Sequence, residues 1–237
     1  MKDSDDLVAR KDDVNKEQGE KLRGMQQIVV DCEGSGEFLS LGEALRSGCV
    51  ATGTVITMKG GTYKEKIDLC IRHEHLTIQA ASSKENVVIQ TYGRIQVDAN
   101  HVTLSGLSVD RLSPKGHDGV EELGGIAIYV QAGTAVVLEN CNATSATGVA
   151  IFIGDSACSR EIDVTMVMCN ARSSVSSAII CVGSCTQLQL QQCSASDSKY
   201  GLVLRLGATA RVRSSHFSRN QNFGLCVKQC AGEETVI

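Results

Sequence analysis

Three acidic residues lie beside strands predicted in the first half of the sequence: Asp68, Asp98 and Asp110. Carboxylates that face each other on neighbouring strands can act as general acid and general base, which is the chemistry of many hydrolases and lyases. No ladder of acidic residues runs from strand to strand in this sequence. We therefore expect these three carboxylates to be solvated residues at strand ends.

Two histidines, His73 and His75, form a His-x-His pair of a kind that occurs in zinc sites. They lie in a predicted turn and have no further ligand close in the sequence. Two cysteine pairs have the spacing Cys-x-x-x-Cys, which strand ends explain better than a metal: Cys181/Cys185 and Cys226/Cys230. The sequence therefore predicts no metal site and no cofactor.

An insertion at 111–124 interrupts the pattern of strands and contains the single proline of the chain. It also gathers four side chains that could bind a metal or a sugar: His117, Asp118, Glu121 and Glu122. Because polar insertions are usually surface loops, we predict a mobile polar loop here.

The chain has 237 residues, of which 42% are hydrophobic and 21% charged, enough for one sizeable core. Its net charge of −4 argues against a nucleic-acid-binding protein, which usually carries a basic stripe. No run of 18 apolar residues is present, so no membrane span is predicted. Carbohydrate stays open as a ligand.

Eleven cysteines are an odd number for a disulfide framework, and no apolar leader precedes them. Several recur within a repeat, where a free thiol serves as a small apolar side chain. We therefore expect a reducing compartment, with the protein in the cytoplasm and the nucleus or an organelle as the alternative.

The highly charged segment 1–24 predicts a disordered or loosely helical tail, and 25–237 a single folded domain. Within the domain, Ser40 and Glu43 have the spacing of a capping box that opens a short helix. Beyond that helix the sequence predicts only strands.

The dominant feature is an internal repeat of apolar strands. One set of strands ends at 107, 141, 169, 193 and 217, and a second set begins at 125, 148, 177, 201 and 224. A recurring step of about 24 residues predicts one coil of a solenoid, in which each coil buries its apolar side against the next. The fold class predicted is an all-β, parallel β-helix.

Alternation along each strand assigns side chains to the inside or the outside of the coil. Three inward groups are predicted: Val149/Ile151/Ile153, Ala178/Ile180/Val182 and Leu202/Leu204/Leu206. Cys141, Cys169 and Cys193 form a further inward column. A sandwich or barrel built from hairpins is the alternative, but Asp118-Gly119 is the only tight-turn pair.

The outward side of the second strand set is unusually apolar. We predict that it binds a protein partner or a second copy through Tyr129, Phe152, Ile179, Cys181, Val203, Arg205 and Lys228. The alternative is that the N-terminal tail or the 111–124 loop covers it. The last coil has no capping helix after it in the sequence, which also invites pairing.

The segments IVVDCEGSGEFLSLGEAL, GGTYKEKIDL and LTIQA, within 27–80, resemble the N-terminal cap and first coils of pectin methylesterases. The resemblance implies the right-handed β-helix of the pectin-lyase-like superfamily. The later coils are similar to carbohydrate-binding and sugar-hydrolase repeats of some intracellular proteins.

That family's chemistry uses two aspartates, a glutamine pair and an arginine. The resemblance places the first glutamine near Gly125, one aspartate near Thr147-Gly148 and the other near Ser176-Ser177. None of these positions holds a matching residue. We therefore predict that the chain is not an enzyme and serves as a scaffold for a protein partner; a carbohydrate-binding or carbohydrate-active protein is the alternative.

Overall fold

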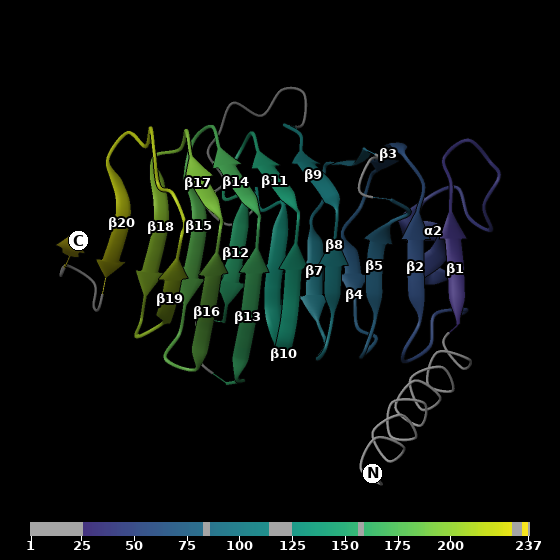
Figure 1. Ribbon diagram of the computed structural model, residues 1–237, viewed down its shortest axis with the longest axis horizontal. Coiled ribbons are helices and arrows are strands. Elements are labelled where there is room, and N and C mark those ends of the chain that lie inside the picture. The colour runs from purple at the N-terminus through teal and green to yellow at the C-terminus, as the bar shows by residue number, and fades with distance from the viewer. Residues whose placement is uncertain (1–25, 83–85, 114–124, 156–158, 229–233, 237) are drawn as a thin grey trace, which may run out of the picture.

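The computed structural model describes residues 26–82, 86–113, 125–155, 159–228 and 234–236. Its strands stack side by side along one long axis, from β1 at one end to β21, next to β20, at the other (Figure 1). Three faces, here called A, B and C, run along this axis, and the chain visits them in turn.

The strands divide among the three faces as follows. Face A holds β1 (Gln27–Val30), β2 (Val55–Met58), β5 (Thr77–Ala80), β8 (Thr103–Ser105), β13 (Ile162–Val167), β16 (Thr186–Gln191) and β19 (Thr209–Arg213). Face B holds β3 (Gly61–Glu65), β6 (Val87–Thr91), β9 (Leu107–Arg111), β11 (Asn142–Ser145), β14 (Asn170–Ser173) and β17 (Ser194–Ser196). Face C holds β4 (Leu69–Ile71), β7 (Ile95–Asp98), β12 (Ile151–Gly154), β15 (Ser177–Val182), β18 (Tyr200–Arg205), β20 (Phe223–Lys228) and β21 (Glu234–Val236).

Neighbouring strands on each face are parallel, as in the pairs β2 and β5, β6 and β9, and β15 and β18. Among the described residues the exception is β21, which lies antiparallel on β20. Parallel neighbours need a crossover between them, and here each crossover is formed by the strands of the other two faces. The predicted parallel β-helix is confirmed.

Strand β10 (Ile128–Glu139) differs from the prediction of two separate strands at 125–130 and 136–141. It begins on face C beside β7 and β12 and continues onto face A beside β8 and β13. Gly133 lies at the bend with a φ of 128°, and a Cβ there would approach the carbonyl oxygen of Ala99 to 2.1 Å. Glycine is therefore required where the strand turns the corner.

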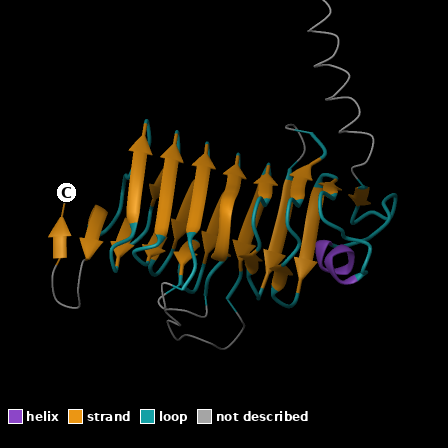
Figure 2. Ribbon diagram, turned by 90° about the horizontal axis from the view of Figure 1, so that it is seen from below, coloured by secondary structure: helices purple, strands orange, loops and turns teal. Residues whose placement is uncertain are grey.

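The N-terminal end is closed by α2 (Leu41–Arg46), seen end-on in Figure 2. The Ser40 Oγ accepts a hydrogen bond from the Glu43 backbone N–H at 3.2 Å, and Glu43 Oε2 accepts one from the Leu39 N–H at 3.0 Å. The Ser40 half of the predicted capping box is thus present, whereas Glu43 accepts from the N–H of Leu39 in place of that of Ser40. Leu41 and Ala44 are fully buried and seal the first coil.

Inside the solenoid, like side chains lie above one another from coil to coil. On face C one row is Ile128, Ile151, Ile179 and Leu202, and all four are fully buried. Cys141, Cys169 and Cys193 form a second buried column, as predicted. The Cys169 thiol donates to the carbonyl oxygen of Leu138, 3.2 Å away in the preceding coil. These thiols act as interior packing.

The predicted orientation of β15 is wrong. Ile179 and Cys181 point inward and are fully buried, whereas Ile180 and Val182 belong to a separate cluster outside the coil. The sequence pattern aligned Gly148 with Ser177, a step of 29 residues, but Ile151 pairs with Ile179, a step of 28. A shift of one residue exchanges the two sides of a strand.

Val149 and Leu206 were also predicted to point inward, and both predictions are wrong. Val149 belongs to the outer cluster with Ile180. Leu206 lies after β18 at a corner with a φ of 52° and is 46% exposed. Its predicted partners Leu202 and Leu204 do face the interior. The tail at 1–24 and most of the 111–124 insertion lie outside the described residues, as do Cys158 and Cys230.

Within the part of the chain that the structure describes, no helix is long and apolar enough to cross a lipid bilayer.

The orientation of β15 can be tested by stability. Replacing Ile179→Ala removes buried methyl groups from the interior row, so we expect the free energy of unfolding to fall by about 2–5 kcal/mol. Gln189→Ala, on the solvent side of β16, is the control and should change it by less than about 0.5 kcal/mol. Urea unfolding followed by circular dichroism measures both. Equal, small effects would show that Ile179 is not interior.

Candidate functional site

The outer side of face C carries a second apolar cluster. Ile180, Val203 and Cys226 point outward in one register row and are no more than 5% exposed. Four partly buried rings pack against them: Tyr129, Phe152, Tyr200 and Phe223. The chain has eight aromatic residues in all, so half of them gather on this side of one face. Such a concentration of rings on an outer surface is typical of a binding site.

Tyr129 and Phe152 form the first ring pair, on β10 and β12. Their ring centroids are 5.4 Å apart and the planes are nearly perpendicular. The Arg94 guanidinium lies over the Tyr129 ring, 5.0 Å from its centroid. Asp68 holds that arginine: Arg94 Nε lies 3.4 Å from Asp68 Oδ2, and the Arg94 backbone N–H donates to Asp68 Oδ1 at 3.0 Å. The arginine is therefore oriented by both the carboxylate and the ring.

A second acid–arginine pair lies at the C-terminal end of β7. Arg160 Nη1 donates to Asp98 Oδ1 at 2.8 Å, although the two residues are 62 positions apart in the chain. Asp98 ends β7, and its side chain is 27% exposed. We call Asp68, Arg94, Asp98, Tyr129 and Arg160 the face-C site.

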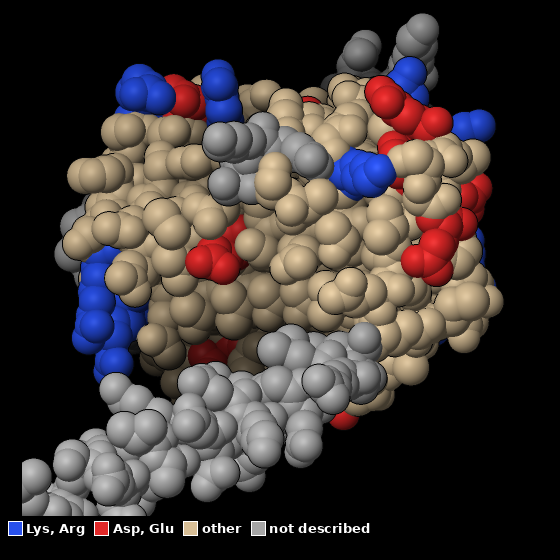
Figure 3. Space-filling model, turned by 45° about the vertical axis from the view of Figure 1, so that its right-hand side comes forward, with Lys and Arg blue, Asp and Glu red and all other residues tan. Residues whose placement is uncertain are grey.

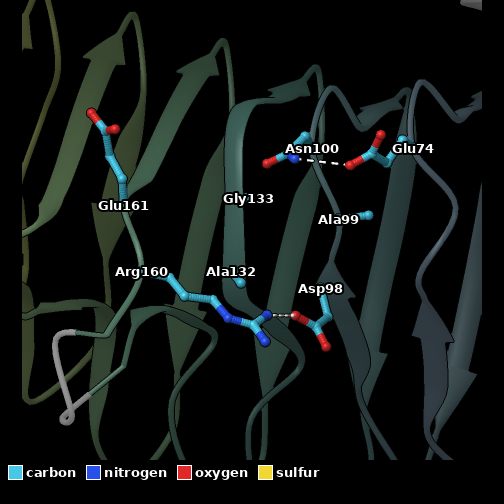
Figure 4. Close-up of a pocket in the computed structure, with 8 residues that line it drawn as sticks. All are labelled: Glu74, Asp98, Ala99, Asn100, Ala132, Gly133, Arg160 and Glu161. Carbon is cyan, nitrogen blue, oxygen red and sulfur yellow. Dashed lines mark hydrogen bonds and ion pairs between the residues drawn. The ribbon is translucent and has the colours of Figure 1, made fainter.

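A polar cavity of about 310 Å³ adjoins the Asp98–Arg160 pair at the corner between faces C and A. Figure 4 shows Asp98 and Arg160 pointing toward each other, with Glu74 and Asn100 paired on the far side of the cavity. The Asn100 amide donates to Glu74 Oε1 at 2.9 Å. The cavity is thus lined by carboxylates, an amide and a guanidinium, which are the groups that bind hydroxyl-rich or anionic ligands.

The surroundings of Tyr129 shift the pKa of its phenol. Burial raises the pKa of its phenol above the ordinary value, the carboxylates of Asp155 and Asp98 raise it further, and Arg94 partly opposes them. The phenol, which is neutral at neutral pH as in any tyrosine, is a hydrogen-bond donor, and the shift extends its neutral form to higher pH.

The second ring pair lies at the C-terminal end of the same face. Tyr200 and Phe223 are 6.1 Å apart, and the ammonium groups of Lys199 and Lys228 lie 6.0 and 5.6 Å from the Tyr200 centroid. Arg205 is in register with Lys228 on the next strand. This end of face C therefore combines rings with positive charge.

Of the seven residues predicted to bind a partner, the structure places five outside the coil. Tyr129, Phe152 and Lys228 are partly buried there, Arg205 is exposed, and Val203 is only 1% exposed. Ile179 and Cys181 face the interior, where burial raises the pKa of the Cys181 thiol to about 12. They are removed from the candidate site.

The polar residues that the sequence analysis considered as candidate site residues also lie in different places. Asp68 and Asp98 join the face-C site, whereas Asp110 lies on face B and accepts a hydrogen bond from Thr144 Oγ1 at 2.7 Å. His75 stacks on His101, with centroids 4.4 Å apart. Sequence reasoning missed Arg94 and Arg160, because no local spacing links them to the aspartates that they bind.

The positions that the pectin methylesterase resemblance marked as catalytic do lie together. A Cβ on Gly125 would meet Thr147 Oγ1 at 2.5 Å, and the Ala150 N–H bonds to the Ser177 carbonyl oxygen. These residues lie where the face-C strands begin, on successive coils. They carry no carboxylate, so any acid on this face must come from elsewhere.

Comparison with known proteins gives one family match. A family model described as right handed beta helix region matches residues 93–237. Among curated proteins, a probable pectinesterase from Arabidopsis thaliana (probable pectinesterase 67) is 25% identical over 126 residues, covering 48% of this chain and 36% of the relative.

Two solved structures share the fold. Pectin methylesterase PemA from Erwinia chrysanthemi aligns with a TM-score of 0.55 and 16% identity, over 84% of this chain and 60% of the enzyme. Pectate lyase Pel9A aligns with a TM-score of 0.56 and 12% identity, over 86% of this chain and 69% of the lyase. The chain thus spans about a third of the curated relative and less than two thirds of PemA.

These comparisons contradict the prediction that the chain is not an enzyme. Its curated relative is a pectinesterase, and its structural neighbours are a pectin methylesterase and a pectate lyase. The prediction treated three empty family positions as the absence of any catalytic group. The ion pair of Asp98 with Arg160, 62 positions apart in the chain, was not part of that prediction.

Spectroscopic titration tests the surroundings of Tyr129. The difference between the phenolate absorbance curves of the wild type and Tyr129→Phe isolates this phenol, and its midpoint should lie above pH 10.0. Asp155→Asn removes a negative neighbour and should move the midpoint down, because a nearby carboxylate disfavours the phenolate. A midpoint at or below the ordinary value would contradict the described geometry.

Proposed function

Because the chain belongs to the right-handed β-helix family and carries two aspartate–arginine pairs around Tyr129 on face C, we propose that it is a carbohydrate-active protein. Its ligand is an acidic polysaccharide of the pectin type, bound along face C. The observation that carries the proposal is the convergence of rings, carboxylates and guanidinium groups on one outer surface.

The arrangement of the rings supports a linear ligand. Tyr129 and Tyr200 lie on β10 and β18, which are three strand spacings apart through β12 and β15. At roughly 4.8 Å per spacing, the two ring pairs are about 14 Å apart along the solenoid axis. A polysaccharide lying parallel to that axis would contact both. Rings pack against the apolar faces of sugars, and the neighbouring cations suit carboxylate groups.

The reacting group we assign is the Asp98 carboxylate. It lies at the rim of the polar cavity with part of its surface open to a ligand. An ionised carboxylate in that position can take a proton from a water molecule or from a sugar carbon as a general base. The adjacent Arg160 guanidinium can stabilise negative charge that develops on the substrate.

We also propose a reducing, intracellular location. Seven of the cysteines that the structure describes carry free thiols, among them Cys49 and Cys70, which are exposed. Exposed thiols are prone to oxidation outside a reducing compartment, which supports this assignment.

A second role, binding of a protein partner, is favoured by a separate observation, the four partly buried rings that gather on the outer side of face C, because aromatic side chains are enriched at protein interfaces.

The proposal is tested with polygalacturonate and methyl-esterified pectin as substrates. Turnover is followed by acid release and by the absorbance of unsaturated products, and binding by calorimetry. Asp98→Asn should lower turnover by about 10²–10⁴-fold while binding persists. Tyr129→Ala should weaken binding about ten-fold or more, as for other aromatic anchors.

Asp110→Asn on face B is the matched control, since it removes a carboxylate from a different surface. It should leave both turnover and binding unchanged. A wild-type protein that neither binds nor converts either polymer would exclude the proposal, as would an Asp98→Asn variant with full activity.

A further inference from the structure

A pair of glutamines lies beside Tyr129 on the outer side of face C. Gln96 lies on β7 between the buried residues Ile95 and Val97, so its side chain points outward. It is in register with Tyr129 on β10. The Gln96 Nε2 donates to Gln131 Oε1 at 2.7 Å, and the pair is partly buried. An amide has two N–H groups and a carbonyl oxygen, so both residues can also donate to a ligand and accept from it.

Each arginine of the face-C site already contacts a carboxylate. Arg94 Nε lies 3.4 Å from Asp68 Oδ2, and Arg160 Nη1 lies 2.8 Å from Asp98 Oδ1. A carboxylate on a ligand would therefore compete with a carboxylate of the protein for either guanidinium group. The attraction that it gains is reduced by the repulsion from the aspartate beside it.

The surroundings of these two pairs are acidic. The Asp155 carboxylate is close enough to Tyr129 to raise the pKa of its phenol, and Glu74 and Glu161 line the adjoining cavity. Arg72, which follows β4 on the neighbouring coil, adds a positive charge. Since the two aspartate–arginine pairs are neutral, three carboxylates and one guanidinium group leave a net charge of −2 among these described residues.

This acidic character extends beyond the site. Figure 3 shows that acidic side chains also gather on the N-terminal coils, toward the right of the molecule. A free carboxylate of a ligand is therefore disfavoured at this end of face C, because like charges repel.

The polar groups around Tyr129 are mostly hydrogen-bond acceptors. An ionised carboxylate has no proton to donate, but its two oxygens can accept several hydrogen bonds. The chemical complement of such a surface is an uncharged group that donates, and a sugar hydroxyl is such a group. The amides of Gln96 and Gln131 can bind the same hydroxyl, because they both donate and accept. The carbonyl of an ester, in contrast, only accepts.

We propose that Gln96 and Gln131 are specificity-determining residues that select a neutral sugar unit beside Tyr129. A neutral hexose has a hydroxymethyl group where a uronate has its carboxylate. That group would donate to the acidic surroundings and accept from the amide pair. The polysaccharide bound along face C would then combine uronate units with neutral ones. This inference rests on the proposed function, because it names the kind of unit that the polysaccharide places at this end of the face.

Three oligomers of equal length test the selection: galactose, galacturonate and methyl-esterified galacturonate. Titrations followed by nuclear magnetic resonance at the Tyr129 and Phe152 rings give the Kd at this end of face C. We expect galactose to bind about ten-fold more tightly than galacturonate at low salt, because like charges at a binding site repel. High salt should narrow this ratio. The ester, whose ester group is uncharged but cannot donate, should bind with intermediate affinity.

Substitutions at the two glutamines separate the effect of charge from that of the amides. Gln96→Lys places an ammonium group beside Tyr129 and should strengthen galacturonate binding about ten-fold, which removes the preference. Gln189→Lys makes the same change at an exposed glutamine on face A and should leave all three Kd values unchanged. Gln96→Leu and Gln131→Leu remove an amide without adding charge, and each should weaken galactose binding about three-fold or more.

The results distinguish this inference from the function on which it rests. Binding of galacturonate or of its ester as tight as that of galactose would overturn the inference, while the proposed function would stand. Unchanged galactose binding in both leucine variants would also overturn it, since the amides would then take no part. If none of the three oligomers shifts the Tyr129 and Phe152 resonances, the proposed function fails as well.

Discussion

The structure depends on the vertical alignment of like side chains from coil to coil. A single coil is too thin to bury its own apolar residues, so each row, such as Ile128, Ile151, Ile179 and Leu202, gains burial only from the coils on either side. Backbone hydrogen bonds run in the same direction. The packing of the interior therefore fixes the register of the strands. That register determines the position of every outward side chain.

The candidate site is a consequence of the same alignment. Tyr129 and Phe152 become neighbours because Ile128 and Ile151 do, and Asp98 lies next to them because β7 pairs with β10. The acid–arginine pairs are then formed across coils, with partners 26 and 62 positions apart. A solenoid can assemble a site in this way without any local motif. At the N-terminal end, a helix and a returning loop close the first coil.

The sequence predicted the parts of the structure that repeat. The coil period, the capping box at Ser40 and the column of Cys141, Cys169 and Cys193 all follow from local patterning. The prediction failed where the number of residues per coil changed. One coil of 28 residues was taken as 29, so Ile179 and Cys181 were predicted to point out of the coil, although they point into it. It also failed at the site, since the ion pair of Asp98 with Arg160 has no signature in residue spacing. The expectation of a protein without activity rested on three positions, and the comparisons with pectin-active enzymes contradict it.

The central claim is that a pectin-type polysaccharide lies along the outer side of face C. With four tyrosines and four phenylalanines in the chain, ring resonances can be assigned individually by nuclear magnetic resonance, and titration with a short galacturonate oligomer tests the claim directly. The account predicts shifts at Tyr129 and Phe152, extending to Tyr200 and Phe223 with longer oligomers, and none at Tyr63, which is 1% exposed inside the first coils. Shifts confined to rings away from face C, or no shifts at saturating oligomer, would contradict it.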